Sequence, residues 1–192
     1  YRKGKLDMIA HCIFYGNRYS YSNVVTLQRE FKKHDVKLKC EHIKNFESIK
    51  EHWHKLKYFD NTNEDTIIID IDQTIVGDIS DMINYPVKDN ELITYKNWWD
   101  HSPKCPINGG WYKFKSGSLQ YVWDKFNSDI EKWQLHYYNN GTVHYQYYGE
   151  QNFVYDTVLE NGGKITHMPI EWYSKNTINE NTKIVHHLGV HK

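Results

Sequence analysis

Apolar and polar positions in the first seventy residues follow the period of strands and the period of helices in turn. Three short apolar or alternating segments predict strands, and two segments with an apolar side chain every three to four residues predict helices. In order these are a strand over Met8–Tyr15, a helix capped by Ser22 and continuing to Phe31, a half-exposed strand over residues 36–42, a helix over 46–56 and a strand over 67–70. This strand–helix–strand–helix–strand order implies a parallel sheet with right-handed crossovers.

The second half of the chain is less regular. Its pattern predicts a strand over residues 107–114, a long amphipathic helix over 119–133, a short strand over 164–168 and a C-terminal segment from 184. Residues 137–143 place Asn140-Gly141 between apolar residues, which predicts a β-hairpin with an Asn-Gly turn. We prefer this turn to a glycosylation site, although Asn140-Gly141-Thr142 also fits that sequon. The whole pattern is that of an α/β protein.

Length, charge and cysteine content narrow the class of protein. With 192 residues and 16% aromatic residues, the chain is long enough for one domain with a sizeable core. Its formal net charge of zero argues against a nucleic-acid partner, and no apolar run has the length of a transmembrane segment.

Three widely spaced cysteines, Cys12, Cys40 and Cys105, predict no disulfide framework and favour a reducing, cytoplasmic compartment. Because the first residue is Tyr1, we expect residues 1–192 to be a domain excised from a longer protein.

Two carboxylates stand where a predicted buried strand ends. Ile67, Ile68 and Ile69 are followed by Asp70 and Asp72. In open α/β sheets, ligands bind at the carboxyl ends of the strands. Two neighbouring acids repel each other, and a divalent cation shared with a substrate phosphate is the simplest partner for them. We therefore expect Mn²⁺ or Mg²⁺ at Asp70 and Asp72.

This acidic pair fits two classes of enzyme. Nucleotide-sugar glycosyltransferases of the GT-A fold use D-x-D to hold a metal on the donor diphosphate. Haloacid-dehalogenase-type phosphatases use D-x-D-x-T, which Asp70-Ile71-Asp72-Gln73-Thr74 also fits, with Asp70 as nucleophile. About seventy residues of alternating strand and helix precede Asp70, which favours sugar transfer, because those phosphatases usually carry the nucleophile on their first strand. A pair of acids that only caps a loop is the structural alternative.

The C-terminal residues carry the more specific likeness. Residues 186–192 read His-His-Leu-Gly-Val-His-Lys. This segment resembles the H-x-x-G-x-x-K motif that ends the catalytic domain in retaining glycosyltransferase family 8. That family includes glycogenin and bacterial galactosyltransferases. The resemblance implies a mixed, mainly parallel GT-A sheet flanked by helices. It also implies that His186 is the third metal ligand and that Gly189 and Lys192 bind the nucleotide diphosphate.

Shorter motifs extend the resemblance along the chain in the family's order. It implies that the residues at the end of the first strand, Tyr15, Gly16 and Asn17, contact the uracil and ribose. It implies that the N-x-G strand, here Asn108, Gly109 and Gly110, contacts the donor sugar. Lys55 stands in place of the family's usual arginine, also beside the donor sugar. Glu150-Gln151-Asn152 resembles the family's D-Q-D with both acids altered. If the sugar configuration inverts, Glu150 is the candidate base; if it is retained, Gln151 supports the anomeric carbon.

The function expected from these residues is metal-dependent transfer of a hexose from a UDP-sugar to a glycan or another hydroxyl acceptor. In its brevity the chain also resembles the small glycosyltransferase domains of large algal DNA viruses, which would place it in a host cytoplasm. A phosphatase using Asp70 and a non-catalytic carbohydrate-binding domain are the alternatives. The donor sugar, the acceptor, the stereochemical course and the oligomeric state are left open by the sequence.

Overall fold

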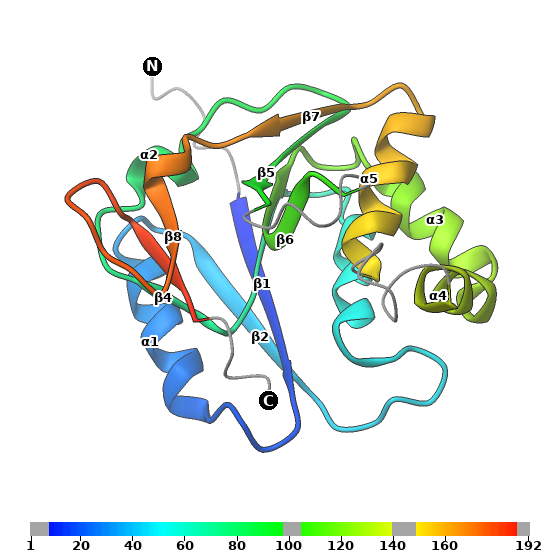
Figure 1. The fold of residues 1–192 in the computed structure, drawn as a ribbon, viewed down its shortest axis with the longest axis horizontal. Coiled ribbons are helices and arrows are strands. Elements are labelled where there is room, and N and C mark those ends of the chain that lie inside the picture. The colour runs from blue at the N-terminus through cyan, green and yellow to red at the C-terminus, as the bar shows by residue number, and fades with distance from the viewer. Residues whose placement is uncertain (1–7, 98–104, 140–148, 188–192) are drawn as a thin grey trace.

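A mixed sheet forms the centre of the part of the chain that the structure, a computed structural model, describes: residues 8–97, 105–139 and 149–187. Among these residues, six strands pair in the order β2-β1-β3-β6-β5-β7 (Figure 1). Their bounds are β1 Met8–Tyr15, β2 Lys37–Ile43, β3 Asp65–Ile69, β5 Glu91–Lys96, β6 Ile107–Phe114 and β7 Lys164–His167. β1 runs parallel to β2 and β3, β6 runs antiparallel to β3 and β5, and β7 runs parallel to β5. The predicted α/β class with a mixed, mainly parallel sheet is confirmed.

Helices cover both faces of this sheet and divide the core into two layers. Helix α1, Tyr21–Lys32, buries an apolar face against one side of the sheet. The 3₁₀ helix η1, Glu51–Asp60, lies on the other side with α3, Gln120–Ser128, and α5, Glu150–Glu160 (Figure 1). The three isoleucines of β3 show this division directly. Ile67 and Ile69 belong to the α1 layer and Ile68 to the other, so β3 is buried on both faces as its sequence predicts.

Several local predictions are wrong for identifiable reasons. The N-cap of helix α1 is Ser20 and not Ser22. The backbone at Ser20 is still extended, and its N–H donates to Asn23 Oδ1 in the first turn at 3.1 Å. The predicted helix over residues 46–56 begins only at Glu51 and has 3₁₀ geometry. The predicted long helix is two helices, α3 and α4, Ile130–Asn139, because the backbone at Asp129 is extended, with φ −161°.

The predicted hairpin around Asn140 is also wrong in its first arm. Residues 137–139 form the last turn of α4, so they are helical and not part of a strand. The helical spacing that begins at Ile130 continues through this segment and outweighs the turn signal that follows it. Residues 140–143, the remainder of the predicted hairpin, lie outside the described residues.

A small second sheet, which the sequence did not predict, brings the end of the described chain back to the centre. It consists of β4, Gln73–Ile75, β9, Ile184–His186, and β8, Tyr173–Lys175. β9 is antiparallel to β4, with His186 opposite Gln73. The short helices α2, Ser80–Ile83, and η3, Ile170–Trp172, accompany it. Because Gln73 directly follows Asp72, this pairing places His186 beside the acidic pair.

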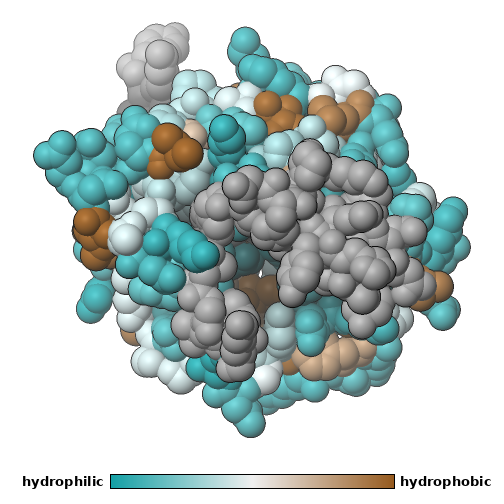
Figure 2. Space-filling view, viewed as in Figure 1, coloured by the Kyte–Doolittle hydropathy of each residue, from teal (hydrophilic) through white to brown (hydrophobic). Residues whose placement is uncertain are grey.

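The described surface has a mainly polar character. On the face shown in Figure 2, apolar residues of the described part are scattered among hydrophilic ones. Exposed apolar side chains come from separate elements, as with Tyr21 on α1, Leu135 on α4 and Ile170 on η3. None of the described helices has both the length and the apolar character that crossing a bilayer requires.

Stability is expected to fall as the pH drops from 6.5 to about 4, because of His11 on β1. This side chain is 8% exposed and stacks on Tyr58 with 4.0 Å between the ring centroids. Burial, with Lys39 and Lys57 nearby, lowers the pKa of His11 from 6.5 to about 4. Between these values the unfolded chain binds a proton that the folded chain does not, so stability falls by up to about 1.4 kcal/mol per pH unit.

Urea unfolding at a series of pH values measures this contribution. His11→Gln is expected to flatten the acid limb of the stability curve, whereas His136→Gln, a change at an exposed position of α4, is expected to leave it unaltered. Parallel curves for the wild type and His11→Gln would contradict the assignment.

Candidate active site

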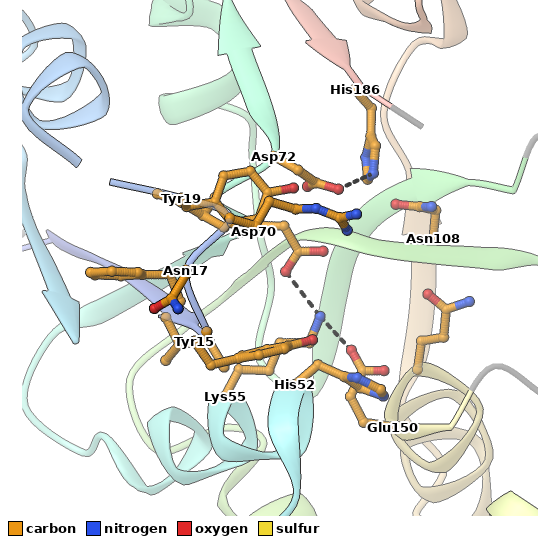
Figure 3. A pocket seen from close by; sticks show the side chains of 16 residues that line it. Tyr15, Asn17, Tyr19, His52, Lys55, Asp70, Asp72, Asn108, Glu150 and His186 are labelled. Carbon is orange, nitrogen blue, oxygen red and sulfur yellow. Dashed lines mark hydrogen bonds and ion pairs between the residues drawn. The ribbon is translucent and has the colours of Figure 1, made fainter. Parts of the chain in front are cut away.

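A cavity of about 570 Å³ opens at the carboxyl ends of β1 and β3 (Figure 3). It is lined by the end of β1 and the loop after it, one side of η1, the turn after β3, the start of β6, the first turn of α5 and the end of β9. The lining residues are Ile13, Phe14, Tyr15, Gly16, Asn17, Arg18, Tyr19, His52, Lys55, Asp70, Ile71, Asp72, Asn108, Glu150, Gln151 and His186. Binding at this end of the strands is the general expectation for an open α/β sheet.

Most of the residues singled out from the sequence meet at this cavity. Its lining includes Tyr15, Gly16, Asn17, Lys55, Asp70, Asp72, Asn108, Glu150, Gln151 and His186. Gly109 and Gly110 are buried in β6 directly after Asn108 and are not among the lining residues. Gly189 and Lys192 lie outside the described residues, so their diphosphate role stays a prediction.

Asp72 and His186 form one direct contact in the site. Asp72 Oδ2 lies 2.9 Å from His186 Nε2, and both side chains are 7% exposed (Figure 3). The next residue reinforces the arrangement, because the His187 N–H donates to the Asp72 carbonyl at 3.0 Å. Two residues from distant parts of the sequence are therefore held together by the β4–β9 pairing.

Lys55 forms the second group of contacts in the site. Its ammonium lies 3.1 Å from Asp70 Oδ1, donates to the Gly109 carbonyl at 2.9 Å and forms an ion pair with Glu150 (Figure 3). It also lies 5.3 Å from the centroid of the Tyr112 ring. The Lys55 side chain is 3% exposed, and that of Glu150 is also 3% exposed. A buried lysine from η1 thus joins Asp70, directly after β3, to Glu150 at the start of α5.

The charges of this group perturb one another. Burial lowers the pKa of Lys55, but the carboxylates of Asp70 and Glu150 more than compensate and hold it above its usual range. Burial raises the pKa of Asp70, and it raises that of Glu150 to about 7, although Lys55 opposes both shifts. With both acids ionised, one ammonium faces two carboxylates, and Asp72 adds a further negative charge nearby. A bound cation would reduce this excess.

The donor types in the site fit a divalent metal. Carboxylate oxygens and an imidazole are ligands that Mn²⁺ takes, and Asp70, Asp72 and His186 supply them. Within the described ranges, no three His, Cys, Asp or Glu side chains are gathered closely enough to hold an ion as they stand. Asp70 contacts Lys55 and Asp72 contacts His186, so a metal would bind by replacing side-chain contacts that already exist.

The sequence analysis missed some residues of the site. Gln73 lies behind the cavity, where its amide donates to the Gly110 carbonyl and accepts the Tyr95 hydroxyl hydrogen bond at 2.9 Å. In the D-x-D-x-T pattern Gln73 occupies a position that the pattern leaves unspecified. His52 lines the cavity three residues before Lys55, and this spacing on one face of a 3₁₀ helix is a signal that could have found it.

Two glycines of β6 allow these side chains to approach the strand. A Cβ on Gly109 would lie 2.9 Å from Glu150 Oε1 and 3.1 Å from Lys55 Nζ. A Cβ on Gly110 would lie 2.5 Å from Gln73 Nε2 and 3.2 Å from His186 Nδ1. The glycine pair is therefore explained by close packing behind the cavity, and its predicted contact with a donor sugar stays a prediction.

Gly110→Ala is expected to destabilise the protein by about 1–3 kcal/mol, because the added methyl group overpacks a buried site. The same methyl group would push against His186, so the nucleotide binding expected from the sequence should weaken as well. Urea unfolding and UDP titration in Mn²⁺ measure the two effects. Wild-type behaviour in both experiments would show that the strand and its neighbours have more room than the contacts indicate.

Comparison with known proteins gives the fold independent support. No protein-family model matches the sequence, and no curated protein matches it. The galactosyltransferase LgtC, solved with donor and acceptor sugar analogs, matches with a TM-score of 0.63 at 12% identity over 95% of this chain and 87% of that one. A glycosyltransferase involved in glycosylation of the major capsid of PBCV-1 matches with a TM-score of 0.61 at 16% identity, covering 95% of each chain.

A mammalian enzyme shares the same architecture. Mouse xyloside xylosyltransferase 1 matches with a TM-score of 0.56 at 10% identity over 96% of this chain and 99% of that one. The chain has the GT-A fold. The resemblance predicted from the sequence, both to family 8 glycosyltransferases and to the small glycosyltransferase domains of large algal DNA viruses, is therefore confirmed as a structural match.

Proposed function

We propose that this GT-A protein is a metal-dependent glycosyltransferase that moves a hexose from a UDP-sugar to a hydroxyl of a glycan or another acceptor. One observation carries the proposal: the acids that end β3 and the imidazole that ends β9 line the same cavity of a GT-A fold. LgtC was solved with donor and acceptor sugar analogs, which supports a sugar donor for a protein of this fold. The match with a glycosyltransferase involved in glycosylation of the major capsid of PBCV-1 is consistent with an acceptor hydroxyl on a protein or on its glycans.

The proposed binding roles follow the walls of the cavity. Tyr15 ends β1, Gly16 and Asn17 follow it, and all three would contact the uracil and ribose. Asp70, Asp72 and His186 would hold Mn²⁺ or Mg²⁺ against the diphosphate. When bound, the metal neutralises the charge that develops on the leaving diphosphate, an effect worth several kcal/mol. We retain Gly189 and Lys192 as proposed contacts to the same phosphates.

The far side of the cavity would position the donor sugar. Asn108 and Lys55 line it, and Lys55 is held in place by Glu150 and Asp70. Gln151 accepts the Gly109 N–H at 2.8 Å, which fixes its amide at the cavity wall. An LgtC structure carries an active-site glutamine changed to glutamate, which is consistent with a glutamine acting in this fold. We therefore propose Gln151 as a residue beside the reacting carbon.

Glu150 is proposed for proton transfer if the reaction inverts the sugar. Its carboxyl lines the cavity, and burial raises its pKa to about 7, a value suited to accepting a proton near neutral pH. Its ion pair with Lys55 also keeps it in position. If the configuration is retained, the leaving phosphate can take the acceptor proton. The role of Glu150 would then be only to hold Lys55 in position through their ion pair.

The rival functions make different demands on the protein. A haloacid-dehalogenase-type phosphatase would need Asp70 as a nucleophile on a different fold, but the fold is that of GT-A enzymes. A carbohydrate-binding domain that has lost catalysis would keep the fold and the cavity without turnover. The first alternative is disfavoured by the fold, and the second is separated from our proposal by experiment.

Screening UDP-sugars for hydrolysis in Mn²⁺ tests the proposal. We expect UDP release from at least one UDP-hexose, with loss of that activity on chelation by EDTA. Release of phosphate from phosphate monoesters would favour the phosphatase instead. Binding of UDP without hydrolysis of any UDP-sugar, and without transfer to any glycan offered, would favour the non-catalytic domain.

A further inference from the structure

Two of the three cysteines are neighbours in the sheet. Cys12 on β1 is the direct register partner of Cys40 on β2, and both side chains face the α1 layer, where Cys12 is buried and Cys40 packs against it. Adjacent strands lie about 4.8 Å apart. The Cα atoms of disulfide-bonded cysteines usually lie about 4.4–6.8 Å apart, so this pairing meets the basic requirement for a bond. The wide sequence spacing had predicted no such pair.

The two thiols differ in access and in acidity. Cys12 is fully buried in the α1 layer, whereas Cys40 is half-buried and lines a second cavity of about 460 Å³. The neighbouring Cys12 thiol lowers the pKa of the Cys40 thiol, and the proximity of Cys40, with burial, raises the pKa of Cys12. Thiolates are the reactive form of cysteine. Cys40 is thus the accessible nucleophile and Cys12 the partner behind it.

The cysteine pair also adjoins the candidate active site. Phe14 on β1 and His42 on β2 are the register pair two residues further along, with ring centroids 4.3 Å apart. Phe14 lines both the second cavity and the main one, as do Gly16, Asn17 and Tyr19. A small molecule that enters the second cavity therefore reaches Cys40 from the same surface that opens to the nucleotide site.

We propose that Cys12 and Cys40 form a reversible intramolecular disulfide by exchange with a low-molecular-weight disulfide such as oxidised glutathione. The Cys40 thiolate attacks one sulfur of that disulfide, which breaks its S–S bond and releases one glutathione. Cys12 then loses its proton and attacks Cys40 Sγ in the mixed disulfide, releasing the second glutathione. Two protein thiols are oxidised, one glutathione disulfide is reduced, and the two protons end on the two glutathione thiols.

Incubation of the folded protein with oxidised glutathione tests this proposal. We expect the number of titratable thiols to fall from three to one. We also expect an intact mass lower by two hydrogens and a proteolytic fragment that links the peptides of Cys12 and Cys40. Dithiothreitol should restore all three thiols.

Single substitutions provide the controls. Cys12→Ala is expected to retain one glutathione on Cys40, and Cys40→Ala to react with none. Cys105 is the matched buried control, because burial raises its pKa to about 12, so Cys105→Ala should form the cross-link at the wild-type rate. Circular dichroism confirms the folding of each variant.

Three results on the wild-type protein would overturn the proposal, whatever the variants do. These are three thiols that stay titratable, glutathione that remains on Cys40 without cross-linking, or equally fast modification of Cys105. The experiment contains no nucleotide, metal or sugar, so its outcome is independent of the proposed transferase function.

Discussion

Lys55→Met is expected to lower the free energy of unfolding by about 3–5 kcal/mol, since removing one partner of a buried ion pair leaves charge without compensation. Asp70 and Glu150 would lose the ammonium that now contacts both of them. Methionine keeps most of the length and apolar character of the lysine stem. The lost free energy of unfolding therefore reflects the missing charge more than a change in side-chain volume. Urea unfolding at pH 8 measures it.

The pH dependence of this loss provides an internal check. Because burial already raises the pKa of Glu150 to about 7, Glu150 takes up a proton more readily as the pH falls. The deficit of Lys55→Met should therefore be smaller at pH 5 than at pH 8. Adding Glu150→Gln to Lys55→Met removes one of the stranded charges, and the double variant should recover part of the stability.

Lys57→Met is the matched control on the same helix. Lys57 pairs with Glu41 at the surface, where the side chains are 29% and 48% exposed. Exposed ion pairs are worth about 0–1 kcal/mol, so this change should be nearly neutral. A Lys55→Met variant as stable as Lys57→Met would contradict the buried network that the site depends on.

Asp72→Asn is expected to weaken metal-dependent UDP binding by about 100-fold or more. Loss of a residue that only supports a metal ligand typically costs about 10–100-fold, and loss of a ligand should cost at least as much. Asparagine keeps the shape of the side chain but removes the charge that the cation would need. The measurement is UDP affinity in Mn²⁺, with unfolding followed alongside to confirm that the fold is retained.

Asp78→Asn is the control for this prediction. Asp78 follows the acidic pair on the same stretch of chain, but its side chain is 69% exposed and it is not among the residues that line the cavity. We expect wild-type UDP affinity from it. If Asp72→Asn binds UDP in Mn²⁺ as tightly as Asp78→Asn does, Asp72 is not a metal ligand.

The fold was predictable from sequence where the signal is local. The alternation of strand and helix up to Asp70 gave the parallel half of the sheet correctly, because each element there buries its own apolar face. The break at Asp129 and the 3₁₀ geometry of η1 depend on packing between elements, which periodicity does not contain. The β4–β9 pairing joins residues from distant parts of the chain and carries no local pattern at all.

The site was predictable as a set of residues but not as a set of contacts. The order of short motifs selected Asp70, Asp72 and His186, and the structure places all three at one cavity. That Lys55 would join Asp70 to Glu150 follows from how η1 and α5 lie against the sheet. The neighbourhood of Cys12 and Cys40 likewise follows from the register of β1 and β2, which one sequence does not reveal.

Calorimetric titration of the wild-type protein with UDP, first in EDTA and then in Mn²⁺, tests the central claim most directly. If a cation joins Asp70 and Asp72, directly after β3, and the imidazole of His186 on β9 to the phosphates of a nucleotide, UDP affinity should be at least about tenfold higher in Mn²⁺. The same affinity in EDTA and in Mn²⁺ would contradict the account.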